Sequence, residues 1–242
     1  IFIDNPQNGG YNFYGMQLEA CNASNVNKGV VANNKIRIGN FSTELAQNYG
    51  VILFNSSHIN VYYNTVAVIN NADYSYAFYA EQGASNLVKN NNFTNWGTPT
   101  AVNFGAPSPW AGAVIFNGTP NFSVFESNNN NLYSQNGDIG QINGVDYSNM
   151  MDWQNNTGYD MMSQNVDPLF GDLIKLQPCS DSLDGTAEPI ANITMDFDNQ
   201  MRDASKPDIG ADEFTPVGRF GMDDAGICDG DVVQLMAPFA DT

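Results

Sequence analysis

Apolar and polar residues alternate along short stretches of this chain, as they do in β-strands that bury one face. In the stretch VYYNTVAV, apolar side chains stand at Val61 and Tyr63 and again at Val66 and Val68. The two pairs are out of phase, and Asn64 lies at the break. A tight turn at Asn64 would explain the shift, because both flanking strands must point their apolar residues into one core.

The same shape recurs along the chain, which indicates a repeat. Four segments combine Asn with a following apolar residue: NNKIRI (33–38), YNTVAV (63–68), NNNFTN (90–95) and NNNLYS (129–134). Each follows a segment of alternating apolar positions: YGMQLEAC (14–21), YGVILFNS (49–56), YAFYAEQG (76–83) or AGAVIFNG (111–118). The spacing from Tyr49 to Tyr76 is 27 residues, and so is the spacing from Asn64 to Asn91. Ile36, Val66 and Phe93 are then equivalent positions.

Each unit therefore predicts a strand, a short turn, a second strand and a looser loop. No helical periodicity lies between the units, so a βαβ arrangement is not expected. Repeats of about 22–35 residues are typical of one coil of a β-solenoid. We predict an all-β fold with about five coils within residues 1–170, in which residues 139–158 form a degenerate fifth copy.

Asparagine marks the predicted corners of these coils. The chain has 35 Asn, of which 33 lie at or before Asn165. Asn adopts the left-handed backbone conformation at little cost, and stacked Asn side chains hydrogen-bond to one another between stacked strands. We predict structural corners at Asn34, Asn64, Asn91 and Asn131.

Charge narrows the set of partners. The 242 residues include 8 Lys and Arg against 26 Asp and Glu, for a net charge of −18. Such a chain is a poor partner for nucleic acid or an anionic membrane surface. No apolar run approaches the roughly 20 residues that span a bilayer, so we expect no membrane insertion.

Motifs near the end of the repeats carry a resemblance to a known family. PDIGADEF (207–214), QNVDPLF (164–170) and NITMDFDNQMR (192–202) resemble the closing motifs of right-handed parallel β-helix domains in very long secreted proteins of Bacteroidota. Asn199 stands where that family usually has Gly. The resemblance implies a right-handed parallel β-helix, a secreted or cell-surface location and export by the type 9 secretion system. It implies little about activity, because these domains serve as passive scaffolds.

The predicted domains are the coils (1–170), a closing segment of the β-helix (171–214) and a linker with the first strands of another module (215–242). In that last part, CDGDVVQL resembles the opening of an immunoglobulin-like module, in which Cys228 would pair. The chain begins at Ile1 with neither an initiator Met nor a signal peptide. We therefore expect it to be a piece of a longer or processed protein.

Catalytic motifs are scarce. The chain has one His, His58, and its three cysteines, Cys21, Cys179 and Cys228, lack CxxC spacing, which argues against a His-based triad and a zinc site. The β-helix polysaccharide lyases and glycoside hydrolases remain alternatives, although no carboxylate pair stands near Lys35 and Arg37 in the repeat. The sequence therefore favours a non-catalytic protein over an enzyme.

Two ligand classes stay open. Asp196 and Asp198 are weak candidates for Ca²⁺, and they could instead form Asx turns and pair with Arg202. Tyr62, Tyr79, Trp96 and Trp110 could stack on sugar rings if exposed, or could pack loops against the coils.

Taken together, we expect a non-catalytic structural or adhesive segment of a long secreted surface protein, such as an adhesin or a gliding-related filament. Its partners would be adjacent modules of the same chain and surface polysaccharide. A carbohydrate-active enzyme and a carbohydrate-binding module of a secreted degradative protein are the alternatives.

Overall fold

Parallel β-sheets make up most of the regular structure, which confirms the predicted all-β class. The structure is a computed structural model, and it describes residues 1–3, 12–39, 47–69, 74–97, 110–117, 124–217 and 227–228.

Three sheets contain all but two of the strands described. The first sheet consists of β2 (Phe13–Glu19), β5 (Gln47–Phe54), β8 (Tyr74–Glu81), β11 (Trp110–Asn117), β14 (Asp138–Ile142) and β15 (Val145–Tyr147). The second sheet consists of β3 (Gly29–Ala32), β6 (Ile59–Tyr62), β9 (Asn86–Lys89) and β12 (Val124–Asn128). The third sheet consists of β1 (Phe2–Ile3), β4 (Lys35–Ile38), β7 (Thr65–Val68), β10 (Asn92–Asn95) and β13 (Asn131–Ser134).

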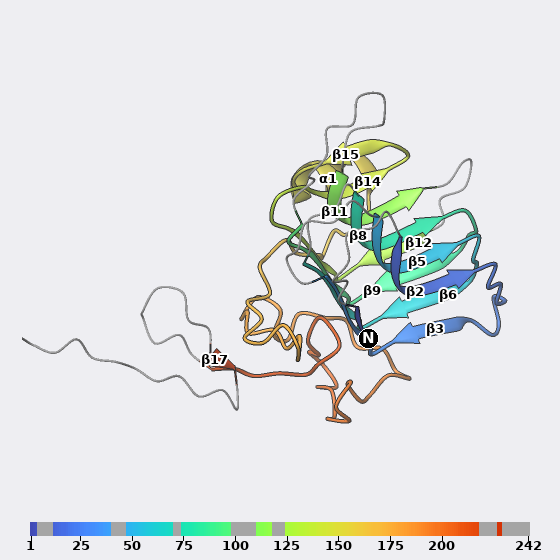
Figure 1. Cartoon of the computed structure of the whole chain (residues 1–242). Coiled ribbons are helices and arrows are strands. Elements are labelled where there is room, and N and C mark those ends of the chain that lie inside the picture. Colours follow the sequence, from blue (N-terminus) through green and yellow to red (C-terminus); the bar gives the residue numbers. More distant parts are fainter. Residues whose placement is uncertain are drawn as a thin grey trace, which may run out of the picture.

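The chain visits the three sheets in turn, so neighbouring strands in a sheet come from successive units (Figure 1). Tyr49 pairs with Tyr76 and Val66 pairs with Phe93, which confirms the repeat spacing predicted between these units. Ile36 pairs with Val66, as expected from the shared pattern.

Each unit has three strands, whereas the pattern of the repeat unit predicted two. The short strand β6 is the one that the alternation before Asn64 indicated, and it buries Ile59 and Val61. It ends at Tyr62, and a two-residue turn then leads to β7. Tyr63 therefore lies in the turn and not on the strand, so its side chain does not join Val61 in the core.

The core lies between the sheets. One apolar cluster combines residues of all three sheets, including Val61 of the second, Val66 and Phe93 of the third, and Phe78 of the first. The rings of Phe78 and Phe93 stack with their centroids 5.1 Å apart. Burial of these side chains is the main force that holds the sheets together.

The predicted fifth copy only begins as a repeat. Strand β14 continues the first sheet in parallel, but the chain then reverses through a turn at Asn143 and Gly144, and β15 returns antiparallel. Helix α1 (Met150–Thr157) follows, and its fully buried Trp153 packs against Gly140 of β14. The helix covers this end of the core (Figure 1).

The closing segment (residues 171–214) forms no helix or strand element and packs on the outside of the sheets. Its Leu176 joins Ala67 and Ile69, while Ile209 and Phe214 join Tyr62 and Tyr63. Beyond it, β16 (Pro216–Val217) pairs antiparallel with β17 (Ile227–Cys228). The rest of the predicted immunoglobulin-like module lies outside the described residues.

Within the described part of the chain, no helix is both long and apolar enough to cross a membrane.

The contact between α1 and the first sheet gives a test of the helical cap. A Cβ atom at Gly140 would lie 2.6 Å from the ring of Trp153, so Gly140→Ala should displace the helix and destabilise the fold by about 1–3 kcal/mol. Urea denaturation followed by tryptophan fluorescence measures this loss. In a double-mutant cycle with Trp153→Leu the cost should shrink, because the clashing ring is gone. An undiminished cost would show that the ring is not its cause.

Candidate functional site

A ladder of asparagine side chains joins the turns between the second and third sheets. The Nδ2 group of Asn34 donates to Oδ1 of Asn64 at 2.8 Å. Asn64 donates to Asn91 at 2.9 Å, and Asn91 donates to Asn130 at 3.0 Å. Asn64, Asn91 and Asn130 are fully buried, so these amides have no access to water.

The ladder also holds the backbone of each turn. The backbone N–H of Asn64 donates to Oδ1 of Asn91 at 3.0 Å, and that of Asn91 donates to Asn130 at 2.9 Å. The Nδ2 group of Asn91 donates in addition to the carbonyls of Val61 and Lys89, each at 2.9 Å. Buried amide groups are costly when unpaired, and here both ends of the Asn91 amide are satisfied.

The fourth rung of the ladder is Asn130, one residue before Asn131, the corner predicted from the sequence. Leu132 pairs with Phe93, so Asn130 and not Asn131 is equivalent to Asn91. Asn131 instead begins β13, where its Nδ2 group donates to Oδ1 of Asn92 at 2.9 Å.

The ladder ends on a buried carboxylate, Asp160. Asn130 donates to its Oδ1 atom at 3.0 Å, as do the hydroxyls of Ser163 at 2.7 Å and Ser127 at 2.9 Å. The indole N–H of Trp153 donates to Oδ2 at 2.9 Å. Burial raises the pKa of Asp160, and the four donors oppose that shift. The repeat pattern gave no sign of this residue, because it lies after the last unit.

The left-handed backbone conformation belongs to the residue before each rung. Asn33, Tyr63, Asn90 and Asn129 have φ values of 54°, 52°, 61° and 54°. The sequence pattern predicted this conformation at the rung residues themselves, one residue later. The doubled Asn in three of the four turns reflects two separate needs, a positive φ and then a ladder rung. At Tyr63 an aromatic residue takes the left-handed position, which costs it about 1–2 kcal/mol.

The side chains at these positive-φ positions form an outer row that binds the closing segment. Asn33 donates to the carbonyl of Met195 at 2.7 Å. Asn90 donates to the carbonyl of Glu188 at 2.7 Å and accepts the N–H of Glu188 at 3.0 Å. The hydroxyl of Tyr63 donates to that same carbonyl at 2.7 Å. The outer row thus binds backbone N–H and carbonyl groups of the closing segment.

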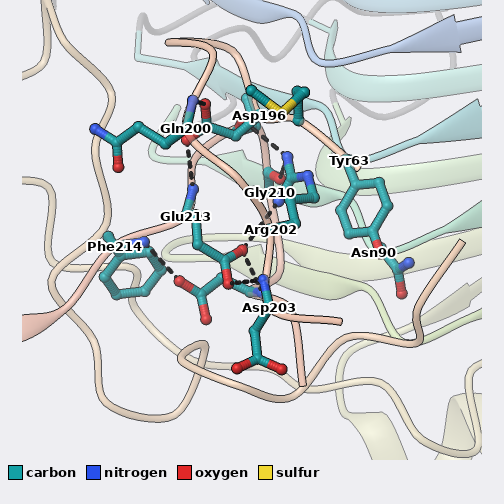
Figure 2. Close-up of polar contacts among 12 residues, drawn as sticks. Tyr63, Asn90, Asp196, Gln200, Arg202, Asp203, Gly210, Glu213 and Phe214 are labelled. Atoms are coloured by element: carbon teal, nitrogen blue, oxygen red, sulfur yellow. Dashed lines mark hydrogen bonds and ion pairs between the residues drawn. The ribbon is translucent and has the colours of Figure 1, made fainter. Parts of the chain in front are cut away.

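Arg202 lies at the centre of this contact (Figure 2). Its guanidinium sits over the ring of Tyr63, 4.0 Å from the centroid, and its Nη2 atom donates to Oδ1 of Asn33 at 3.0 Å. The same nitrogen donates to the carbonyls of Gly210 at 3.0 Å and Ala211 at 2.9 Å. Only 2% of the side chain is exposed, and burial lowers the pKa of Arg202.

Arg202 brings together two of the three motifs that carry the family resemblance. It belongs to NITMDFDNQMR, and its carbonyl partners belong to PDIGADEF. Glu213 of the second motif lies 3.5 Å from Nη1 of Arg202 and accepts the backbone N–H of Asp203 at 2.8 Å (Figure 2).

The predicted metal candidates have structural partners. Asp196 accepts the backbone N–H groups of Asp198 at 2.9 Å, Gln200 at 2.7 Å and Glu213 at 2.9 Å, as expected of an Asx turn. The side chain of Asp198 is 55% exposed and lies 3.7 Å from Lys35. Among the described residues, no three His, Cys, Asp or Glu side chains are grouped so that they could hold a metal ion.

Two of the predicted sugar-stacking residues are covered. Tyr62 is only 9% exposed, because Leu183 and Phe214 of the closing segment join it in a cluster. Trp96 packs at 5.6 Å from the ring of Phe170 and at 5.9 Å from that of Tyr133. Tyr62 and Trp96 therefore pack against neighbouring side chains, which was the alternative to sugar stacking.

Tyr79 belongs to a row of tyrosines on the outer face of the first sheet. The rings of Tyr14 and Tyr49 stack at 5.1 Å, and those of Tyr49 and Tyr76 lie at 5.0 Å. Tyr79 meets Tyr49 and Tyr76 edge-on, each at 5.4 Å. Trp110 begins β11, where it pairs with Tyr74 of β8 in the same sheet. The side chain of Trp110 lies outside the described part of the structure.

The cysteines differ in state. Cys21 is a free, exposed thiol, and Cys179 is in a disulfide bond. The pairing predicted for Cys228 concerns a side chain outside the described part of the structure.

Comparison of the chain with protein-family models, curated proteins and solved structures gives no match.

The ladder predicts a large cost for losing one amide. Asn91→Ala should destabilise the fold by about 2–4 kcal/mol, because the rungs on both sides and two backbone carbonyls lose partners. Urea denaturation gives the free energy. Asn27→Ala is the control, since Asn27 is exposed, and it should change stability by less than about 0.5 kcal/mol. Equal effects of the two substitutions would contradict the role of the ladder.

A second prediction concerns pH. Burial raises the pKa of Asp208 from 3.8 to about 7, although its carboxylate accepts the N–H groups of Gly185 and Phe214. The folded chain then binds this proton more tightly than the unfolded chain. The stability that Asp208 contributes is full below pH 3.8 and is lost as the pH rises through about 7.

Carbon-13 NMR titration of the carboxyl groups measures this directly. Asp208 should titrate near pH 7, while exposed Asp203, whose pKa is lowered by hydrogen bonds from Ser205 and Lys206, should titrate below 3.8. In denaturation experiments the wild type should lose stability relative to Asp208→Asn between these pH values. A midpoint for Asp208 at or below that of Asp203 would refute the prediction.

Proposed function

We propose that the three sheets form a right-handed parallel β-helix. The support is the strand order, in which equivalent strands of successive units pair in parallel. Connections between parallel strands of one sheet are right-handed in nearly all proteins. In this arrangement each unit is one coil, and α1 covers the last coil.

The chain is, on this proposal, a non-catalytic structural segment of a long secreted cell-surface protein, such as an adhesin or surface filament. The observation that carries the proposal is the asparagine ladder, which runs through four successive turns and ends on Asp160. Its buried polar groups are used to hold one coil on the next, which suits a stiff scaffold. A repeat held by nearest-neighbour contacts can also be extended along one axis.

The secreted location and type 9 export rest on the resemblance of the closing motifs. The contacts of Arg202 with Gly210, Ala211 and Glu213 give these motifs a structural role, which supports reading them as a closing element. Adjacent modules of the same long chain would be the main partners. The net charge of −18 favours neutral surfaces or cation-bridged acidic ones over nucleic acid.

Carbohydrate binding is the second candidate function, and the tyrosine row favours it. Tyr14, Tyr49 and Tyr79 are partly exposed on one sheet face. The hydroxyl of Tyr49 donates to Gln47 at 2.8 Å, and that of Tyr79 donates to Glu81. Aromatic rings beside amide and carboxylate groups are a common setting for sugar recognition.

A panel of neutral and acidic polysaccharides, with and without Ca²⁺, tests both proposals. Residues 1–242 are mixed with each polymer, and unsaturated products, reducing ends and retention on immobilised polymer are followed together. The structural proposal predicts no new chain ends with any polymer. A polysaccharide-cleaving activity that co-purifies with residues 1–242 would overturn it in favour of the lyase or hydrolase alternative.

Retention without cleavage would support the carbohydrate-binding candidate. In that case Tyr49→Ala and Tyr79→Ala should weaken retention about tenfold or more, the loss expected for an exposed stacking contact of roughly 1.4 kcal/mol. Tyr133→Ala is the matched control, because Tyr133 packs against Trp96 away from the row. Retention that is equally weakened by the control would remove the tyrosine row as the binding surface.

A further inference from the structure

Lys35 and Asp212 form a buried pair between the third sheet and the closing segment. Lys35 begins β4, and Asp212 lies in PDIGADEF. The Nζ atom of Lys35 is 2.6 Å from Oδ2 of Asp212, and the two side chains are 8% and 2% exposed. The residues are far apart in sequence, so a bond between them would tie the closing segment to the sheet.

Asp212 differs from the other buried carboxylates of the closing segment. Asp196 and Asp208 accept hydrogen bonds from backbone N–H groups. Neither oxygen of Asp212 accepts a hydrogen bond of acceptable geometry from the described residues. The approach of Lys35 is therefore close but lies off the direction of a hydrogen bond. Burial raises the pKa of Asp212 to about 6 against the opposing effect of Lys35, so Asp212 keeps a proton at a higher pH than an ordinary Asp does.

The surroundings supply a proton acceptor and an exit for water. The carboxylate of Asp198 lies 3.7 Å from Nζ of Lys35, and the ring of Phe197 lies 4.7 Å from it. A cavity of about 390 Å³ adjoins the amine and is lined by Lys35, Phe197, Asp198, Ile174 and Gln177 among others. A buried amine beside a neutral acid and a partly exposed base has the groups that amide formation needs.

We propose that Lys35 and Asp212 join in an intramolecular amide bond between Nζ and Cγ. The ammonium group of Lys35 gives one proton to Asp198, and the neutral amine attacks Cγ of the protonated Asp212. The C–O bond to the hydroxyl breaks, and a second amine proton leaves with that hydroxyl as water. The third proton stays on the amide nitrogen, and Asp198 returns its proton to solvent.

This inference is independent of the proposed function, because it rests on one buried pair. Its consequence is that PDIGADEF would be fixed covalently to β4 and could not peel away without breaking a bond. The closing segment has no strand or helix of its own to resist such peeling.

Intact-mass measurement of the reduced, denatured chain of residues 1–242 tests the bond. Its formation should lower the mass by about 18 Da, the mass of one water, relative to the value from the sequence. Trypsin should then leave residues 29–37 joined to residues 203–219, because amidated Lys35 is not cleaved. A wild-type mass equal to the sequence value would overturn the proposal and leave an ion pair only.

Three variants locate the chemistry. Lys35→Arg keeps the charge but removes the nucleophile, so the mass loss should disappear. Lys89→Arg is the matched control, because Lys89 pairs with Glu126 at 2.7 Å while that carboxylate is 43% exposed, and its mass loss should remain. A loss that persists in Lys35→Arg, as a succinimide elsewhere would give, would refute the bond. Asp198→Asn should leave an unlinked fraction, and complete linkage there would refute the role given to Asp198.

Discussion

The rest of the structure depends on the requirement that a buried side-chain amide be hydrogen-bonded at both ends. An Asn side chain has two donors and one acceptor carbonyl, and each group left unpaired in the interior costs about 1–3 kcal/mol. Asn64 and Asn91 meet this requirement through the rungs beside them and the backbone of the turns. The ladder therefore fixes the distance between units and the register of the strands, because a slipped strand would break a rung.

The closing segment follows from the same turns. A two-residue turn that places one Asn inward for the ladder places the preceding side chain outward. There Asn33, Tyr63 and Asn90 meet backbone groups of residues 188–195. A segment without regular structure can then be held by a regular surface. Its position also explains why Tyr62 and Trp96 are covered, whereas Tyr14, Tyr49 and Tyr79 of the first sheet stay partly exposed.

The repeat pattern in the sequence predicted which residues take equivalent inward positions in successive units. Ile36, Val66 and Phe93 were placed correctly because apolar residues must recur at each inward position. The order of roles within the Asn pairs was not predicted, since either residue of an NN pair can take a positive φ. Asp160 and Trp153 were missed because they close the last unit and have no equivalent in the repeat. Helix α1 was missed because MMDWQNNT has little helical preference and is stabilised by the packing of Trp153 over the end of the core.

The direction of the ladder has an electrostatic consequence. Every rung from Asn34 to Asn130 donates toward the next unit, so the side-chain amide dipoles are aligned along the stack. Such a row accumulates partial positive charge at its donor end, as the peptide groups of an α-helix do at the helix N-terminus. Asp160 stands at that end. The stack of turns is thus electrostatically polar. Its Asn130 end favours an anion, and its Asn34 end presents a side-chain carbonyl.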